Sequence, residues 1–242
     1  MHERQIDVPT RDGQMPTFVT HPEEGGPHPA VIVFMDGPGI REELRDMARR
    51  IGTVGYHVML PNLFYRNGGP SFDPALLPIH GPDPEMKRLH DALTHERVLS
   101  DTAALLDAMN GDPVARDPVG CVGYCMGGRH AYAAAGTFPD RVRAMASLHG
   151  GSQVADRPDS AHRLTRHIQA ECYFGFADGD PLTPPEHQDT IAKEMAAHGI
   201  AHRLEIYPGT QHGFTFPTRY CYDKQASERA WERVFALFRR NL

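Results

Sequence analysis

The sequence predicts an α/β protein built on a mostly parallel central sheet with helices on both faces. Short β-favouring apolar runs alternate with amphipathic helical segments along the whole chain, which is the order of βαβ units. Residues 30–35 form a continuous apolar run, as strands buried on both faces do. With 242 residues, 40% of them hydrophobic, the chain can bury one substantial core. Residues 1–242 are therefore expected to form a single domain.

The elements are expected in a regular order. Residues 6–8 and 17–19 flank the turn-like Arg11-Asp12-Gly13 and predict an opening hairpin at the edge of the sheet. Further strands are expected from the apolar runs at residues 30–35, 56–61, 119–124, 144–148 and 171–177, and from the polar–apolar alternation of residues 202–207. Helices are expected from the apolar periodicity of residues 41–54, 94–109, 186–198 and 223–242.

A long stretch, residues 62–93, is dense in proline and glycine and is expected to be irregular. Long irregular loops in compact domains are usually functional or disordered. This one follows the carboxyl end of a predicted strand, so we expect it to lie over the functional site and to shape substrate choice. Arg66, Lys87 and Arg88 could bind an anionic group there, or could be solvated surface residues.

The most informative motif is Gly-x-Cys-x-Gly-Gly, which places Cys125 at the apex of a sharp turn from a strand into a helix. Gly123 and Gly127 lie two residues before and after Cys125, where such a turn has no room for side chains. Gly128 would let the helix pack closely on the sheet. The helix N-terminus favours the thiolate, and the N–H of Met126 points to where an oxyanion would form. The alternative is a buried cysteine in a tight turn.

This motif is the nucleophile elbow of the α/β-hydrolases with cysteine in place of serine. Together with residues 207–214, Tyr-Pro-Gly-Thr-Gln-His-Gly-Phe, it resembles the dienelactone hydrolase family, and the similarity covers nearly the whole chain. The resemblance implies the α/β-hydrolase fold and a Cys–His–Asp triad. Cys125 would be the nucleophile, and His212, which follows the last predicted strand, would be the base.

The triad acid should follow residues 171–177, since α/β-hydrolases place nucleophile, acid and histidine in that chain order. Asp178 and Asp180 both lie in this turn. In the family a proline follows the acid four residues later, and Asp180 and Pro184 keep that spacing. Asp178 instead follows a glycine at an interval sometimes seen before the acid. We favour Asp180, and the other aspartate would cap the turn. His149 is expected to be a packed or hydrogen-bonded histidine.

The turn after residues 30–35 has the sequence Asp-Gly-Pro-Gly and offers a second oxyanion donor. Pro38 has no N–H, so Gly37 is the expected donor. The family carries an acidic residue at the end of this strand, which interacts with the cysteine of the resting enzyme. Asp36 occupies that place and is one methylene shorter than the family's usual glutamate. Its alternative role is to cap the next helix.

The resemblance implies a hydrolase that cleaves a carboxylic ester or a lactone with no cofactor and no metal. Family enzymes that act on the muconate-derived lactone bind its carboxylate with arginines, one of them shortly after the catalytic histidine. Here the first arginine after His212 is Arg219, so dienelactone itself is in doubt as the substrate. Two alternatives remain: a broad carboxylesterase or thioesterase, and a non-catalytic binding or thiol-sensing protein. The esterase would use an apolar pocket formed by Phe64, Tyr65, Phe214 and Phe216.

Composition restricts the partners and the compartment. The formal charge of -6 and the lack of a basic run argue against nucleic acid, so a small-molecule partner is expected. The polar N-terminus has no signal-peptide core, and no apolar run could span a membrane, so we expect a cytoplasmic monomer or small homo-oligomer. The four cysteines have no Cys-x-x-Cys spacing and are expected to be free thiols. The 15 histidines show no metal-binding motif.

Overall fold

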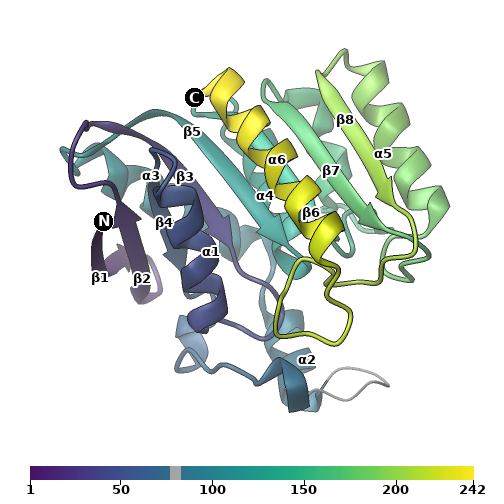
Figure 1. Cartoon of the computed structure of the whole chain (residues 1–242), viewed down its shortest axis with the longest axis horizontal. Coiled ribbons are helices and arrows are strands. Elements are labelled where there is room, and N and C mark those ends of the chain that lie inside the picture. Colours follow the sequence, from purple (N-terminus) through teal and green to yellow (C-terminus); the bar gives the residue numbers. More distant parts are fainter. Residues whose placement is uncertain (77–82) are drawn as a thin grey trace.

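An eight-stranded sheet runs through the computed structural model, which describes residues 1–76 and 83–242 (Figure 1). Its strand order is β1-β2-β4-β3-β5-β6-β7-β8. The β1–β2 and β2–β4 pairs are antiparallel, and the other neighbours are parallel, which confirms the predicted mostly parallel sheet. The strands are β1 (His2–Thr10), β2 (Gly13–His21), β3 (His28–Phe34), β4 (His57–Pro61), β5 (Ala115–Tyr124), β6 (Val142–Leu148), β7 (Glu171–Ala177) and β8 (His202–Tyr207).

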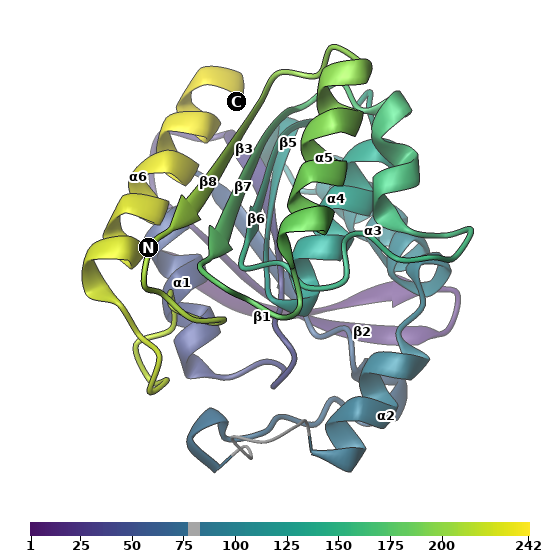
Figure 2. The ribbon, with the colours of Figure 1, turned by 90° about the vertical axis from the view of Figure 1, so that its right-hand side faces the viewer.

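Helices cover both faces of this sheet, as predicted. Figure 2 shows α1 and α6 on one face and α3, α4 and α5 on the other, with α2 beyond the end of the sheet. The α-helices are α1 (Glu42–Gly52), α2 (Pro84–Ala92), α3 (His95–Asn110), α4 (Met126–Thr137), α5 (Pro185–Ala197) and α6 (Lys224–Asn241). Short 3₁₀ helices are η1 (Tyr65–Asn67), η2 (Pro74–Leu76) and η3 (Ala161–His167). No helix in the described part of the chain is both long and apolar enough to cross a membrane.

The prediction that residues 62–93 are irregular is wrong for the last third of this range, where the chain forms α2. Asp83 caps this helix by accepting hydrogen bonds from the N–H groups of Glu85 and Met86. Pro84 is the first helical residue, a position where proline's fixed φ suits a helix and its missing N–H costs nothing. Residues 77–82 of the expected loop lie outside the described residues.

The strand order places three turns side by side at the carboxyl ends of the central strands. Phe34 of β3 is paired with Gly123 of β5, and Tyr124 of β5 is paired with Leu148 of β6. The residues that follow these strands, Asp36, Cys125 and His149, are therefore neighbours although they are far apart in the sequence. This edge of the sheet is where parallel α/β folds form their sites.

Four histidines gather at the other end of the sheet. The ring of His21 lies 5.3 Å from His2, 6.2 Å from His28 and 5.5 Å from His57, measured between centroids. His57 is fully buried, and its Nε2 lies 3.0 Å from Asp112 Oδ2. In the described residues no group of three potential ligand side chains is arranged to hold a metal ion. Burial lowers the pKa of both His28 and His57, so both are neutral in the folded protein at neutral pH.

This histidine cluster should make the fold sensitive to acid. We expect the free energy of unfolding to fall as the pH drops below about 6.5, because the unfolded chain then binds protons that buried His28 and His57 do not. His57→Gln should make the loss shallower, whereas exposed His202→Gln should leave it unchanged. Urea unfolding between pH 8 and pH 5 measures the effect. Equal slopes for the wild type and His57→Gln would show that the cluster is not the cause.

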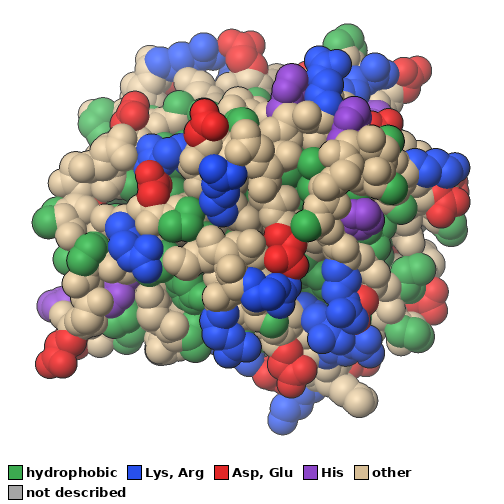
Figure 3. Space-filling view, turned by 90° about the horizontal axis from the view of Figure 1, so that it is seen from above, with side chains coloured by type: hydrophobic (Ala, Val, Ile, Leu, Met, Phe, Trp, Pro, Cys, Tyr) green, Lys and Arg blue, Asp and Glu red, His purple; other side chains and the backbone are tan. Residues whose placement is uncertain are grey.

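The surface drawn in Figure 3 mixes acidic and basic side chains rather than separating them. Ion pairs recur over the outer helices, as between Arg50 and Glu228, and between Arg240 and Glu171. Each exposed pair is worth little on its own. Because the two signs alternate, this face does not present the continuous positive field that attracts polyanions.

Candidate active site

Cys125 lies at the turn between β5 and α4, so the predicted strand–turn–helix motif is confirmed. It is the N-cap of α4, with φ +53° and ψ −118°, a conformation that L side chains rarely adopt. Its N–H donates to the carbonyl of Leu148, and its carbonyl accepts from Gly151, both at 3.1 Å. These bonds hold the strained backbone in place, as is typical of functional residues. The Cys125 side chain remains partly exposed.

The glycines around Cys125 are required by contacts with neighbouring backbone. A Cβ atom on Gly123 would lie 2.0 Å from the carbonyl oxygen of Gly127. One on Gly127 would lie 2.2 Å from the carbonyl oxygen of Phe34. One on Gly128 would lie 2.4 Å from Ser147 Oγ on β6, so the close packing of α4 on the sheet is also confirmed. Each distance is too short for any side chain.

Of the two acid candidates, Asp180 contacts the predicted base. The Nδ1 of His212 lies 2.7 Å from Oδ2 of Asp180, which is fully buried and also accepts from the N–H of Leu182 at 2.9 Å. Asp178 is exposed and accepts from the N–H of Gly209 at 3.1 Å. Because a carboxylate bonded to Nδ1 keeps the proton on that nitrogen, Nε2 of His212 is left to exchange a proton with another group. In the described residues this buried Nε2 has no hydrogen-bond partner.

A second histidine packs behind the first. The ring of His149 lies edge-on to that of His212, with 5.3 Å between centroids. Its Nε2 is bonded to Thr215 Oγ1 at 2.8 Å, and it is fully buried among Phe214 and Phe216. Burial, and then the positive charges of nearby His212 and Arg219, lower its pKa well below the ordinary value. His149 is thus both packed and hydrogen-bonded, in agreement with the prediction, and it is neutral.

The charges of Cys125 and His212 stabilise each other. Burial alone would raise the pKa of the Cys125 thiol, but the positive charge of His212 and then that of Arg219 lower it below the ordinary value. Burial alone would lower the pKa of His212, but the negative sulfur and the hydrogen bond to Asp180 raise it. Each charge therefore stabilises the other, which shifts the two groups towards a thiolate–imidazolium pair.

We expect Cys125 to be alkylated by iodoacetamide at pH 6 well before the other three thiols. Burial raises the pKa of Cys121, Cys172 and Cys221, whereas the pKa of Cys125 is lowered, so Cys125 has the largest thiolate fraction of the four thiols. His212→Ala should slow its labelling by removing the main positive charge. Mass spectrometry of peptides quenched over time measures each rate. Faster labelling of Cys221 than of Cys125 would contradict the assignment.

Asp36 is bonded to arginines rather than to the sulfur of Cys125. It is fully buried, and Arg41 binds both of its oxygens, at 2.7 and 3.0 Å. Arg219 donates a further bond of 2.6 Å. Both guanidinium groups also lie over the ring of Phe216, at 5.0 and 4.5 Å. The expected Asp36–thiol contact is therefore replaced by an ion-pair cluster, and Asp36 acts on Cys125 only through space, as a minor contribution that raises its pKa.

The two expected oxyanion donors lie in the turns that follow the paired strands β5 and β3. Met126 is the first residue of α4, and the N–H groups of a helix's first turn have no partner within the helix. Gly37 is buried in the turn after β3, and its carbonyl lies 3.2 Å from Nε2 of His90 on α2. In the described residues the N–H of Gly37 has no hydrogen-bond partner. Both groups are thus available to a ligand.

The three basic residues that could have bound an anionic group form ion pairs within the protein. Arg66 is bonded to Asp101 and Asp12, Lys87 to Asp91, and Arg88 to Glu85. Of the four residues expected to form an apolar pocket, Phe64, Phe214 and Phe216 are fully buried in the core, whereas Tyr65 is half-buried and its hydroxyl donates to Asp101 at 3.0 Å. Sequence reasoning also missed Arg41, which binds both oxygens of buried Asp36.

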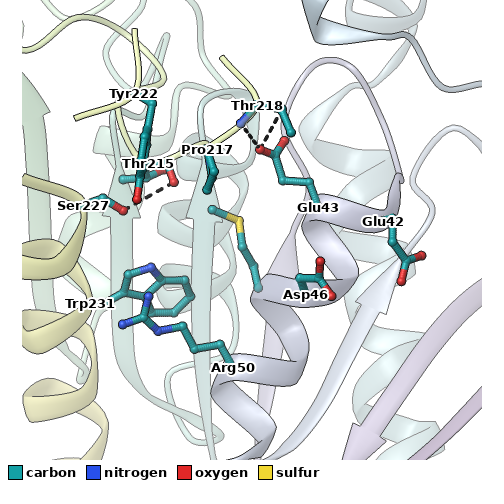
Figure 4. A pocket seen from close by; sticks show the side chains of 11 residues that line it. Glu42, Glu43, Asp46, Arg50, Thr215, Pro217, Thr218, Tyr222, Ser227 and Trp231 are labelled. Atoms are coloured by element: carbon teal, nitrogen blue, oxygen red, sulfur yellow. Dashed lines mark hydrogen bonds between the residues drawn. The ribbon is translucent and has the colours of Figure 1, made fainter. Parts of the chain in front are cut away.

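A separate cavity of about 420 Å³ lies between α1 and α6 (Figure 4). Trp231 and Met47 contribute its apolar wall, and Arg50 lies over the ring of Trp231 at 4.7 Å. Thr215 and Pro217, which follow His212 in the chain, close one end. The residues that line it do not include Cys125, His212 or Asp180. This cavity is not the space in front of the thiol.

The sheet order and the elbow define an α/β-hydrolase. A model of the dienelactone hydrolase family matches residues 15–242, which is most of the chain. The chain belongs to the dienelactone hydrolase family and is a hydrolase.

Relatives and solved structures agree with this assignment. A Synechocystis protein named "Putative carboxymethylenebutenolidase" is 29% identical over 241 residues, covering 98% of this chain and 96% of the relative. An Escherichia coli protein of the same name is 26% identical over 238 residues, covering 96% and 84%. A dienelactone hydrolase-like promiscuous phosphotriesterase from metagenomic libraries aligns with a TM-score of 0.82, 21% identity and coverage of 99% and 98%. Dienelactone hydrolase from Anabaena variabilis aligns with a TM-score of 0.69, 18% identity and coverage of 100% and 98%.

Proposed function

We propose that this protein hydrolyses a carboxylic ester or lactone through Cys125, His212 and Asp180. The observation that carries the proposal is the 2.7 Å contact between His212 Nδ1 and buried Asp180, because it leaves Nε2 of the imidazole for the thiol. The electrostatic coupling of His212 and Cys125 supports the same arrangement. The names of the carboxymethylenebutenolidase relatives point to a lactone as the substrate.

The reaction begins when the thiolate of Cys125 attacks the carbonyl carbon. The carbonyl π electrons move to oxygen, and the N–H groups of Met126 and Gly37 bind the resulting oxyanion, each worth about 3 kcal/mol where such donors have been deleted. When the oxyanion collapses, the C–O bond of the ester breaks and imidazolium His212 protonates the leaving oxygen. The products of this half-reaction are a thioester on Cys125 and an alcohol, or in a lactone the ring-opened hydroxyl.

Water completes the cycle. Neutral His212 takes a proton from water as the water oxygen attacks the thioester carbon, and collapse of the second oxyanion expels the thiolate. The acid leaves, and the thiolate–imidazolium pair is restored. Asp180 keeps the imidazole in one tautomer and stabilises its charged form. The helix α2, whose His90 contacts the carbonyl of Gly37, would lie beside this site and limit which substrates enter.

Hydrolysis of cis- and trans-dienelactone beside a p-nitrophenyl ester tests the proposal, with Cys125→Ala as the background control. Turnover of the lactones well above that of the ester would make a lactone the substrate class. Ester turnover alone would favour a general carboxylesterase or thioesterase. If no substrate is turned over and His212→Ala still reacts with an alkylating agent, the non-catalytic thiol-sensing alternative gains support.

A further inference from the structure

The imidazole of His149 lies at the centre of the segment that carries His212. This segment has no helix or strand before α6, so contacts with the rest of the fold must hold it in place. The ring of His149 lies 5.3 Å from that of His212, measured between centroids. It lies 5.5 Å from the rings of both Phe214 and Phe216. Alternate residues of the segment therefore surround one imidazole, and His212 is the first of them.

A hydrogen bond joins the same imidazole to this segment. Nε2 of His149 lies 2.8 Å from Oγ1 of Thr215, and both residues are buried, with exposed fractions of 0% and 1%. The backbone N–H of His149 donates to the carbonyl of Gly175 on β7 at 2.7 Å. His149 thus connects the central sheet to the segment that carries His212.

Two features of His149 are unfavourable for the stability of the fold. Its φ is +39°, in the left-handed region that L side chains rarely adopt. Of the residues that the structure describes, only Cys125 and Ser152 share a positive φ without being glycine. The Nδ1 of His149 is also buried and has no hydrogen-bond partner among the described residues, whereas an apolar ring would leave no polar atom unpaired. Strained and unpaired groups of this kind are kept mainly at functional sites.

We propose that His149 is a positioning residue for His212, and that its hydrogen bond with Thr215 keeps the imidazole of His212 in its catalytic orientation. Asp180 holds the base through Nδ1 alone, so the ring could still swing about that contact. The ring of His149, at an interplanar angle of 70°, restricts this swing. A displacement of about 1 Å near the reacting groups can lower turnover about 100-fold. The inference rests on the proposed hydrolysis and adds the residue that holds the base.

The test breaks the hydrogen bond from either side with two conservative variants. Thr215→Val keeps the shape of the threonine without its hydroxyl, and His149→Phe keeps an aromatic ring without its nitrogens. Each should lower kcat for a p-nitrophenyl ester about 10- to 100-fold and change KM less than about twofold, because the base moves while the contacts of the substrate do not. Thr215→Ser, which keeps the hydroxyl, should retain most of the wild-type kcat.

The double variant with His149→Phe and Thr215→Val should have about the kcat of either single variant, because one bond can be lost only once. Losses that multiply would overturn the inference. Thr165→Val is the matched control, since Thr165 is fully buried on η3 and its Oγ1 lies 2.5 Å from the hydroxyl of Tyr132. It should lower Tm and leave kcat unchanged. An equal loss of kcat in Thr165→Val would mean that general destabilisation, and not the position of His212, explains the result.

Alkylation of Cys125 separates this inference from the proposed function, because it requires no turnover. A displaced His212 stabilises the thiolate less, so iodoacetamide at pH 6 should label Cys125 several-fold more slowly in Thr215→Val than in the wild type or in Thr165→Val. Slower labelling in a protein that hydrolyses no ester would support the role of His149 and reject the hydrolysis. Unchanged labelling and unchanged kcat, in a protein whose wild type hydrolyses esters, would reject the role of His149 and keep the hydrolysis.

Discussion

Asp180→Asn should lower kcat for ester hydrolysis about 10⁴-fold, the size of the loss when a triad aspartate becomes asparagine elsewhere. The carboxylate of Asp180 accepts the Nδ1 proton of His212 at 2.7 Å, and an amide in its place could instead donate to Nδ1 and stabilise the wrong tautomer. The negative charge that stabilises the imidazolium would also be lost. Steady-state kinetics with a p-nitrophenyl ester, together with thermal melting to confirm folding, measure the effect.

The matched control is Asp178→Asn, two residues earlier in the same turn. Asp178 is exposed and accepts one hydrogen bond from Gly209, so its loss should change kcat less than about threefold and cost at most about 1 kcal/mol of stability. A severe loss of activity in Asp178→Asn with a mild one in Asp180→Asn would reverse the assignment of the acid.

Of the glycine-to-alanine substitutions in the elbow, Gly123→Ala should lower the free energy of unfolding the most. The new Cβ would lie 2.0 Å from the carbonyl oxygen of Gly127 and 2.7 Å from the nitrogen of Gly128, and backbone atoms cannot rotate away as a side chain could. The free energy of unfolding should fall by at least about 3 kcal/mol, since β5 and α4 must separate to make room. Urea unfolding monitored by circular dichroism measures this loss.

Gly111→Ala is the control for Gly123→Ala. Its Cβ would approach nothing closer than 3.7 Å, and its backbone already has a negative φ of −87°, so the variant should be as stable as the wild type or slightly more so. If Gly123→Ala were as stable as Gly111→Ala, the steric account of the elbow would be wrong.

Local features of the sequence were sufficient to predict most of the fold. Residues 30–35 and 172–177 contain only hydrophobic residues and one glycine, and the structure buries them in β3 and β7, whose limits lie within about two residues of the predicted ones. The elbow was predictable because each of its steric requirements falls on a residue within three positions of Cys125. The opening hairpin was predicted too short, because β1 carries exposed polar side chains at its start that weaken the apolar signal.

One local element and the contacts between distant residues were not predicted. The helix α2 was hidden by its own Pro84, since proline ends a helix in most positions and begins one only when a cap such as Asp83 precedes it. The position of Asp36 at the end of a strand was evident, but its bonds to Arg41 and Arg219 depend on how the turn after β3 meets the C-terminal segment. The sequence offered two aspartates in one turn, and only the folded backbone brings one of them to His212.

The bond between Arg219 and Asp36 joins residues 183 positions apart and has a consequence for local unfolding. The segment that follows His212 has no regular secondary structure until α6. If this segment detached, the buried carboxylate of Asp36 would lose one of its two arginine partners. Opening of this segment should therefore require nearly as much free energy as opening of the sheet beneath it. The backbone amides of residues 213–219 should then exchange hydrogen with solvent far more slowly than a surface loop does, which would keep the histidine in register with the thiol between turnovers.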